Sequence, residues 1–143
     1  RPTAGAVALP GIGLTLSTAE PPTSSALPPI PTRPRIVVSR TRPAREALAV
    51  ADALGADLVE MGSAGAKAMA VVRGEADAYL HTGGQHEWDS CAPVAVALAT
   101  GLHATRVDGS PLDYNQADPY LPDLVVCRTE LAGRILAALA SLA

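Results

Sequence analysis

The sequence predicts an α/β fold in which βαβ units place helices against a central sheet, and three consecutive segments carry this prediction. Residues 35–39 (Arg-Ile-Val-Val-Ser) are a continuous β-branched run, as in a strand that is covered on both faces. A helix follows, with Pro43 in its first turn and Gly55 as its C-terminal stop. The apolar segment 58–61 is the next strand, so the three segments form one βαβ unit.

A βαβ unit has a right-handed crossover, which brings the carboxyl ends of its two strands to one edge of the sheet. Ser39 and Gly62 end the two predicted strands and are therefore expected at that edge. Loops and helix N-termini present backbone N–H groups at such an edge, and small anionic ligands bind there. We expect the ligand site at this place.

The first 34 residues predict two different segments. Apolar runs at 6–9 and 14–17 flank a Pro-Gly turn and are typical of a hairpin or a pair of edge strands. No element precedes them, so we expect residues 1–19 to continue a sheet whose other strands belong to a missing N-terminal part. Residues 20–34 contain six prolines and predict an extended connector, which leaves residues 35–143 as the main α/β unit.

A turn of small residues at 62–66 leads into the helix that follows the second strand. Such a turn lets backbone N–H groups approach a ligand closely. Lys67 lies in the first turn of this helix, and it is either a solvated lysine at a tightly packed helix start or a cation that holds an anionic ligand. The helix ends at residues 73–74, and the alternating segment 75–81 predicts a strand.

The segment 85–93 concentrates residues that carry chemistry. Asp89 stands where the next helix is expected to begin, so its carboxylate either caps the first backbone N–H groups or points outward toward a cation. The run 94–99 is apolar and rich in small residues, which predicts that this helix is buried.

A zinc site that uses His81, His86 and Glu87 together with Asp89 is a weaker interpretation of the same segment. The spacing gives no compact pair of ligands on one helix face and no clear fourth ligand. We expect His86 and Glu87 to face water. Mg²⁺ fits Asp89 better, because it prefers oxygen ligands and completes its octahedron with water and phosphate oxygens.

The C-terminal third predicts two strands and a helix. Residues 102–107 and 123–127 are the predicted strands, and residues 108–111 are a turn. Thr129 is expected to cap the last helix, which has a stripe of large apolar side chains along its inner face. That stripe consists of Leu131, Ile135, Leu139 and Leu142.

The composition argues against several classes of function. The net charge is −3 and the 11 basic residues are scattered, unlike in a protein that binds the nucleic-acid backbone. One Trp, three Tyr and no Phe leave too few aromatic side chains for a stacking platform. No run of 18 apolar residues and no secretion signal occur, so we expect a soluble cytoplasmic protein without a membrane partner. Cys91 and Cys127 predict two buried free thiols.

Residues 88–93 (Trp-Asp-Ser-Cys-Ala-Pro), followed by His103 and by residues 109–114 (Gly-Ser-Pro-Leu-Asp-Tyr), resemble the second signature of the inositol monophosphatase family. This family consists of magnesium-dependent, lithium-sensitive phosphatases. Residues 62–71 and 76–80 fit the segment that the family carries just before that signature. The resemblance implies the C-terminal half of the layered α/β sugar-phosphatase fold.

Lys67 and residues 37–40 (Val-Val-Ser-Arg) are more similar to the CysQ-like 3'(2'),5'-bisphosphate nucleotidase branch. The resemblance runs over about residues 35–128. It implies removal of a phosphate from 3'-phosphoadenosine 5'-phosphate, a reaction of sulfate assimilation, with Mg²⁺ as cofactor and a small phosphorylated substrate as partner. It is also compatible with a homo-oligomer.

The resemblance implies a role for each residue at the expected ligand edge. Asp89 would be a metal ligand that also faces the substrate, oriented by a packed Trp88. Gly62 and Gly65 would support the site structurally. The remaining side chains would bind the nucleotide or its phosphate; they are Ser39, Arg40, Ser63, Lys67 and His81.

The chain departs from the family because it has no Glu-Glu pair and no Asp-Pro-Leu-Asp-Gly-Thr loop. One carboxylate cannot hold several Mg²⁺ ions, since several are needed to offset the repulsion between the cations. We therefore expect the C-terminal part of a phosphatase that is not competent alone, with the other half supplied by the same or another chain. The alternatives are a non-catalytic nucleotide-phosphate-binding or interaction module and half of an inositol or fructose phosphate phosphatase.

Overall fold

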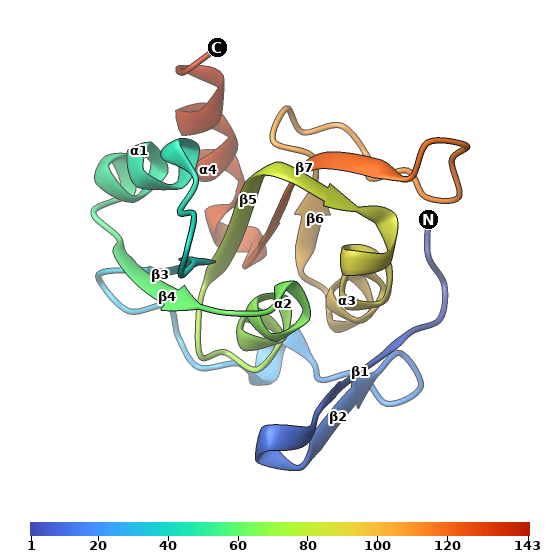
Figure 1. Cartoon of the computed structure of the whole chain (residues 1–143). Helices are drawn as coiled ribbons and strands as arrows, with labels where there is room; N and C mark the ends of the chain where they lie inside the picture. The colour runs from blue at the N-terminus through green and yellow to red at the C-terminus, as the bar shows by residue number, and fades with distance from the viewer.

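The structure is a computed structural model that describes all residues from Arg1 to Ala143. A five-stranded sheet has the order β4-β3-β5-β7-β6, and β1 and β2 form a separate hairpin (Figure 1). The strands are β1 (Ala6–Leu9), β2 (Leu14–Ser17), β3 (Arg35–Ser39), β4 (Asp57–Met61), β5 (Ala78–His86), β6 (His103–Thr105) and β7 (Tyr120–Cys127). The helices are α1 (Arg45–Leu54), α2 (Ala64–Val72), α3 (Glu87–Thr100) and α4 (Thr129–Ala140), and two short 3-10 turns are η1 (Pro10–Ile12) and η2 (Ser24–Ala26).

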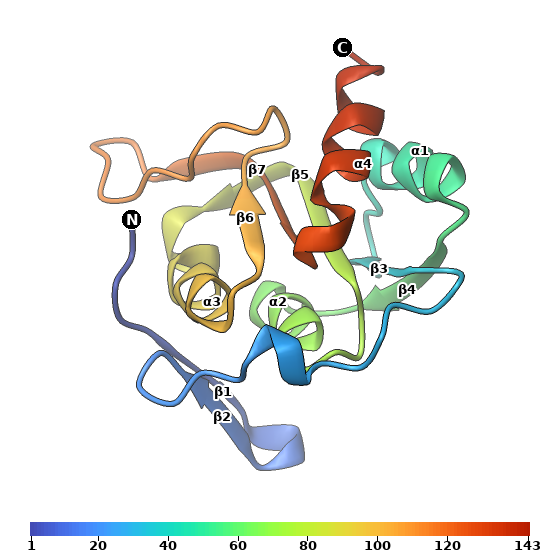
Figure 2. The ribbon, with the colours of Figure 1, turned by 180° about the vertical axis from the view of Figure 1, so that it is seen from behind.

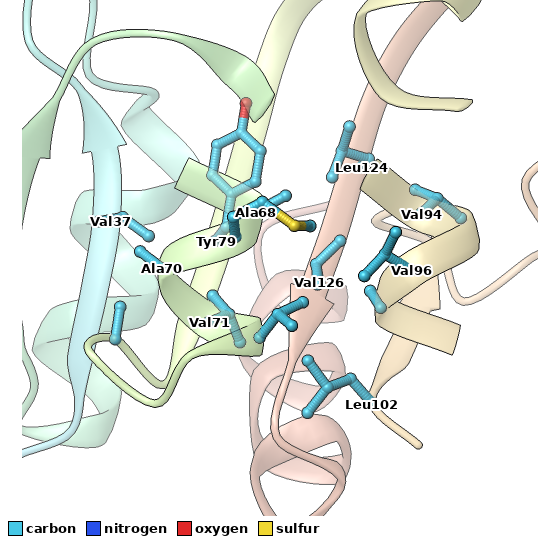
Figure 3. Close-up of a cluster of buried hydrophobic side chains, with 14 of the residues drawn as sticks. Val37, Ala68, Ala70, Val71, Tyr79, Val94, Val96, Leu102, Leu124 and Val126 are labelled. Atoms are coloured by element: carbon cyan, nitrogen blue, oxygen red, sulfur yellow. The ribbon is translucent and has the colours of Figure 1, made fainter. Parts of the chain in front are cut away.

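Helices cover both faces of the large sheet, which confirms the predicted α/β class. α1 and α4 pack against each other on one face, while α2 and α3 lie on the other face between the sheet and the β1–β2 hairpin (Figures 1 and 2). The core accordingly has two parts. Tyr79 of β5 belongs to the part under α2 and α3, where its ring lies beside apolar side chains (Figure 3). The part under α1 and α4 contains the predicted inner face of α1, which is Ala47, Val50, Ala51 and Leu54.

The register of the parallel strands sets up the ligand edge. β3 pairs in parallel with β4 on one side and with β5 on the other. Ser39 is the partner of Met61, and Val37 is the partner of Tyr79. The βαβ prediction is therefore confirmed, and the carboxyl ends of β3 and β4 lie side by side.

Several element ends differ from the sequence predictions. Pro43 precedes the first turn of α1, because the helix begins at Arg45 after the extended N-cap residue Ala44. β5 begins at Ala78 and not at residue 75, since the buried carboxylate of Asp77 holds the backbone N–H and the guanidinium of Arg35. Leu142 lies beyond the end of α4 and is 44% exposed, so it does not belong to the inner face of that helix.

The proline-rich connector is fixed to the main unit at Pro28. The buried guanidinium of Arg128 donates a hydrogen bond to the Pro28 carbonyl at 2.8 Å. Gly74 lies directly against the Pro28 ring and has a φ of +74°. The hairpin also contributes Leu16 to the core under α2 and α3. The division of the chain at residues 19 and 34 stays a prediction.

The close approach of Gly74 to Pro28 gives a test of this packing. In Gly74→Ala the new Cβ would lie 2.7 Å from Pro28 Cδ, in a rigid ring that cannot move aside. We expect a loss of about 2–4 kcal/mol in the free energy of unfolding, from strain in the left-handed region plus overpacking. Gly55→Ala is the matched control, because Gly55 has a φ of +63° and nothing within 4 Å of its Cβ position. Gly55→Ala should lower the free energy of unfolding by only about 1–2 kcal/mol. If urea denaturation gave equal losses for the two variants, the contact between Gly74 and Pro28 would not limit the side chain at position 74.

Candidate functional site

The carboxyl end of β3 and the middle of β5 form one side of a small pocket. Extending the β3–β5 register by two residues places His81 beside Ser39, whose partner on the other side is Met61. Ser39, Arg42 and His81 line a pocket of about 180 Å³ together with the loop before α1 and the glycines that follow Thr82. The pocket therefore lies at the predicted ligand edge.

Lys67 is the central cation of this edge. Its side chain is buried, with 5% of its surface exposed, so the interpretation as a solvated lysine is wrong. The ammonium donates a hydrogen bond to the Met61 carbonyl at 3.3 Å and lies 5.4 Å from the centroid of the Tyr79 ring. Burial lowers the pKa of Lys67. No carboxylate lies within ion-pair distance of it, which leaves a buried cation free to bind an anion.

Half of the ten arginines are already neutralised. Five arginines form ion pairs with carboxylates; they are Arg33, Arg35, Arg73, Arg106 and Arg128. Arg40 and Arg42, in the exposed loop that follows β3, form none. The unpaired positive charge next to the pocket thus favours an anionic ligand.

His81 faces the pocket as a neutral imidazole. Burial lowers its pKa, and the nearby charges of Lys67 and Arg42 lower it further, against an opposing effect of Asp89. One ring nitrogen lies 3.5 Å from the Gly84 carbonyl. His81 can therefore exchange hydrogen bonds with a ligand without adding charge near pH 7.

Asp89 lies at the N-terminus of α3, close to the other site residues. The helix begins at Glu87, two residues earlier than expected, and Asp89 Oδ2 accepts a hydrogen bond from the His86 N–H at 2.8 Å. Burial raises the pKa of Tyr79, and the negative charge of Asp89 raises it further. The same charge acts to raise the pKa of His81. Asp89 therefore caps the helix, and its charge acts on Tyr79 and His81 of β5.

The other predicted binding residues have local structural roles. Ser63 is the N-cap of α2, with a φ of 65°, and its hydroxyl accepts a hydrogen bond from the Ala66 N–H at 3.2 Å. The Ser39 hydroxyl accepts one from the Arg42 N–H at 3.4 Å. Gly62 has open space around it, and Gly65 lies near Val7 of the hairpin without a tight contact. Ser39 thus lines the small pocket, and Ser63 lines a second pocket, against the β1–β2 hairpin.

Trp88 does not pack under Asp89, contrary to the role implied by the resemblance. Its side chain is 69% exposed. Because α3 begins at Glu87, Trp88 sits in the first turn of the helix, beyond the core, and stacks only on His86. The orientation of Asp89 comes from its hydrogen bond to the His86 backbone.

Sequence reasoning missed two polar side chains beside the site. Gln85 is buried and donates a hydrogen bond to the Tyr79 hydroxyl at 2.7 Å, while its own carbonyl oxygen has no partner. Glu87 does not simply face water: its carboxylate accepts hydrogen bonds from the Asn115 and Gln116 N–H groups at 2.7 and 2.9 Å. Nothing in the sequence signals either contact, because Tyr79 and Gln85 meet across an irregularity within β5 and the partners of Glu87 lie 28 and 29 residues further along the chain.

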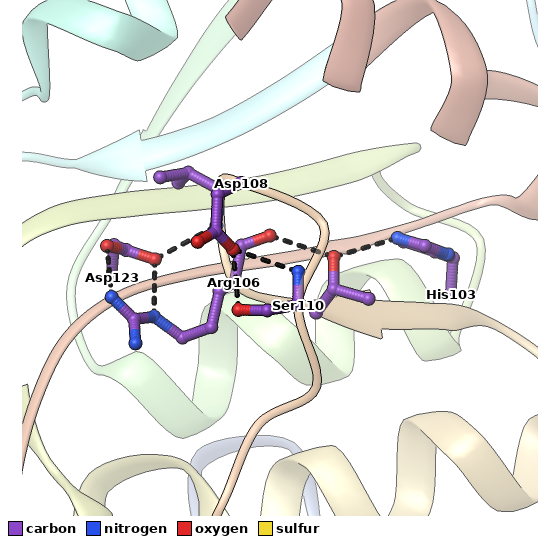
Figure 4. A network of polar contacts seen from close by, with 7 residues as sticks. His103, Arg106, Asp108, Ser110 and Asp123 are labelled. Atoms are coloured by element: carbon purple, nitrogen blue, oxygen red, sulfur yellow. Dashed lines mark hydrogen bonds and ion pairs between the residues drawn. The ribbon is translucent and has the colours of Figure 1, made fainter. Parts of the chain in front are cut away.

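A second polar network lies on β6 and β7. Arg106 forms a two-pronged ion pair with Asp123, at 2.7 and 2.8 Å, and Asp108 holds the turn through Ser110 (Figure 4). This network satisfies charged groups with one another and fixes the 106–110 turn. The two cysteines are free; Cys127 is buried, which raises its thiol pKa to about 12, while Cys91 is only half-buried.

Asp89 fits one position in a magnesium site, because one of its two oxygens accepts no hydrogen bond and Mg²⁺ prefers carboxylate ligands. The chain does not bring three or more His, Cys, Asp or Glu side chains together at any point. Glu87 already holds two backbone N–H groups, and Glu46 accepts a hydrogen bond from Thr82. This chain by itself therefore supplies at most one carboxylate of a metal cluster.

Comparison with known proteins agrees with the fold and the motifs. A family model described as "Inositol monophosphatase family" matches residues 11–142. A Mycobacterium bovis protein named 3'-phosphoadenosine 5'-phosphate phosphatase is 54% identical over 139 residues, which are 96% of this chain and 52% of that protein. An Escherichia coli protein named 3'(2'),5'-bisphosphate nucleotidase CysQ is 32% identical over 88 residues, or 62% of this chain and 36% of that protein.

Solved structures share the fold. Staphylococcal IMPase-II superposes with a TM-score of 0.74 at 16% identity, over 99% of this chain and 61% of that one. CysQ from Bacteroides thetaiotaomicron superposes with a TM-score of 0.60 at 27% identity, over 71% of this chain and 40% of that one. The chain thus spans about half the length of the relatives that it matches. None of its helices has the length and apolar character that crossing a membrane requires.

The neutral state of His81 predicts how stability depends on pH. Its folded pKa lies below the unfolded value near 6.5, so the unfolded chain binds the proton more tightly. Stability should be full above about pH 6.5 and fall as the pH drops below it. His81→Gln should make this decline shallower in urea denaturation between pH 7.5 and 5. An NMR titration of the His81 ring with a midpoint above 6.5 would contradict the prediction.

Proposed function

The chain belongs to the inositol monophosphatase family, and we propose that it is the phosphate-binding part of a Mg²⁺-dependent phosphatase that acts on 3'-phosphoadenosine 5'-phosphate. The mycobacterial relatives that carry this activity in their names support the substrate, since they are 53–54% identical over nearly all of the chain. The position of the Lys67 ammonium, 5.4 Å from the centroid of the Tyr79 ring and without a carboxylate partner, supports the same proposal from the structure.

One observation carries the proposal: the Lys67 ammonium is buried without a counter-ion. An ammonium group has three N–H donors, and Met61 takes one of them. Burial of an unpaired charge lowers the stability of the fold. Such a charge is therefore expected where it binds a ligand of opposite charge. A phosphate group offers both the charge and the acceptor oxygens.

The other site residues would complete the hold on the substrate. Neutral His81 would hydrogen-bond a phosphate or ribose oxygen, while Arg40 and the Ser39 and Ser63 hydroxyls would contact the nucleotide from the two loops. Arg42 adds positive charge to the pocket that Ser39 and His81 line. These contacts position the ester and exclude water from one side of it.

Asp89 would hold Mg²⁺ together with carboxylates that lie outside this chain. When bound, Mg²⁺ supplies an activated water and stabilises the leaving oxygen. The half-length match to the relatives supports the view that the remaining carboxylates come from further sequence, in the same protein or in a partner. Asp89 keeps its orientation through the His86 N–H, independently of any metal.

A non-catalytic module that binds a nucleotide phosphate is the second candidate, because the chain has a buried unpaired cation but no cluster of metal-binding side chains. Calorimetry with adenosine 3',5'-bisphosphate separates the two. Binding that is independent of Mg²⁺ and survives Asp89→Ala favours the module. Tighter binding of inositol or fructose phosphates than of the nucleotide would favour the other phosphatase classes.

Lys67→Met tests the anion site. Methionine fills the volume without the charge, so the stability should stay equal or rise by about 1 kcal/mol, since an unpaired buried charge is removed. Affinity for adenosine 3',5'-bisphosphate should fall about tenfold to a hundredfold, because charge-assisted hydrogen bonds are lost. Arg134→Met, an exposed and unpaired position on α4, is the control and should change neither. A destabilised Lys67→Met with unchanged affinity would assign Lys67 a structural role.

Turnover tests the catalytic proposal. With Mg²⁺, the 143-residue chain alone should release no phosphate from adenosine 3',5'-bisphosphate, because it supplies one carboxylate only. Adding the part of the M. bovis relative outside the matched region should restore turnover, and Asp89→Asn should then lower it at least a hundredfold. Phosphate release by the isolated chain would refute the proposal.

A further inference from the structure

Three aromatic rings gather where β5 meets α3. His86 ends β5 and pairs in register with Tyr120 at the start of β7, while Trp88 lies in the first turn of α3. The His86 and Trp88 rings stack, with centroids 4.4 Å apart and planes 3° from parallel. Tyr120 meets His86 edge-on at 6.2 Å. The fold thus assembles an aromatic cluster that the composition alone argued against.

This cluster, defined as Trp88, His86 and Tyr120, is open to solvent. Trp88 is 69% exposed and Tyr120 is 52% exposed. Scattered exposed apolar side chains are ordinary, but a contiguous exposed group marks a binding site. Because His86 covers one face of the indole, the cluster is already ordered, and a flat ligand has a preformed surface to meet.

The cluster adjoins the pocket on one side and Asp89 on the other. Tyr120 lies against Gly84, where an added Cβ would be 2.7 Å from the Tyr120 ring, and Gly84 lines the same pocket as Ser39 and His81. On the other side, the His86 N–H is bonded to the Asp89 carboxylate. A ligand whose phosphate occupies the pocket can therefore extend over these rings.

We propose that this cluster binds the purine base of the nucleotide, with the base stacked on Trp88. This inference rests on the proposed function, which places the phosphate of the nucleotide in the adjacent site. A base has a π face to lay on the indole, whereas an inositol ring presents hydroxyl groups all round and gains little from that contact. The cluster thereby selects nucleotides over sugar and inositol phosphates.

Trp88 is the only tryptophan, so its fluorescence reports the contact directly. The 143-residue chain is titrated with adenosine 5'-monophosphate, adenosine, ribose 5-phosphate and inositol 1-phosphate. The two compounds that contain adenine should quench the emission, and the two without a base should leave it unchanged. Equal quenching by ribose 5-phosphate would show that the signal follows the phosphate and would overturn the inference.

Variants measured by calorimetry give the affinity. Trp88→Ala should weaken adenosine 5'-monophosphate binding about tenfold, as expected for the loss of one base–aromatic stack, and leave ribose 5-phosphate binding unchanged. Trp88→Phe should recover part of the loss. Ile12→Ala removes another exposed apolar side chain, on the hairpin, and should have no effect. Circular dichroism checks that each variant is folded.

The outcomes distinguish this inference from the proposed function. If adenosine 5'-monophosphate and ribose 5-phosphate bind equally well and Trp88→Ala changes neither, the phosphate site stands and the base site is refuted. If neither compound binds, both proposals fail. If Trp88→Ala weakens both compounds alike, Trp88 acts on the phosphate site, and the stacking role is refuted.

Discussion

The buried ammonium of Lys67 is the constraint on which the site depends. It is enclosed by the Met61 carbonyl and the face of the Tyr79 ring, and no carboxylate balances its charge. The same burial that lowers its pKa strengthens its attraction for an anion, because the local dielectric constant is low. The neighbouring His81 has a lowered pKa and is neutral near pH 7, so it adds no second buried charge. An unpaired buried ammonium gives the fold less stability than an apolar side chain of the same size would give.

The N-terminus of α3 brings several functions to one turn of backbone. Asp89 satisfies the His86 N–H, and Glu87 holds the loop at Asn115 in place. The same turn projects Trp88 outward over His86. Because each side chain leaves the helix in a different direction, one turn serves the helix cap, the loop and the exposed aromatic surface. The carboxylate of Glu87 is already held by two backbone N–H groups, so Asp89 is the carboxylate that this turn leaves for a metal.

The parts of the site that depend on local chemistry were predicted from the sequence, and those that depend on distant contacts were not. The βαβ unit and its ligand edge follow from residues 35–61, because hydrophobic pattern and crossover handedness are local properties. The Tyr79–Gln85 hydrogen bond was missed because a bulge reorients Gln85 within β5. The Glu87 contacts join residues 28 and 29 positions apart and leave no pattern in the sequence.

The sequence by itself determined the α/β class, the family and the positions of Lys67 and Asp89, since periodicity, helix signals and motif spacing are all written along the chain. Only the tertiary structure decided that Lys67 is buried without a partner and that Trp88 is exposed. Burial depends on which elements cover a side chain, and that depends on how α2 and α3 pack on the sheet. The aromatic cluster has the same origin, because β5–β7 pairing brings Tyr120 to His86 across 34 residues of chain.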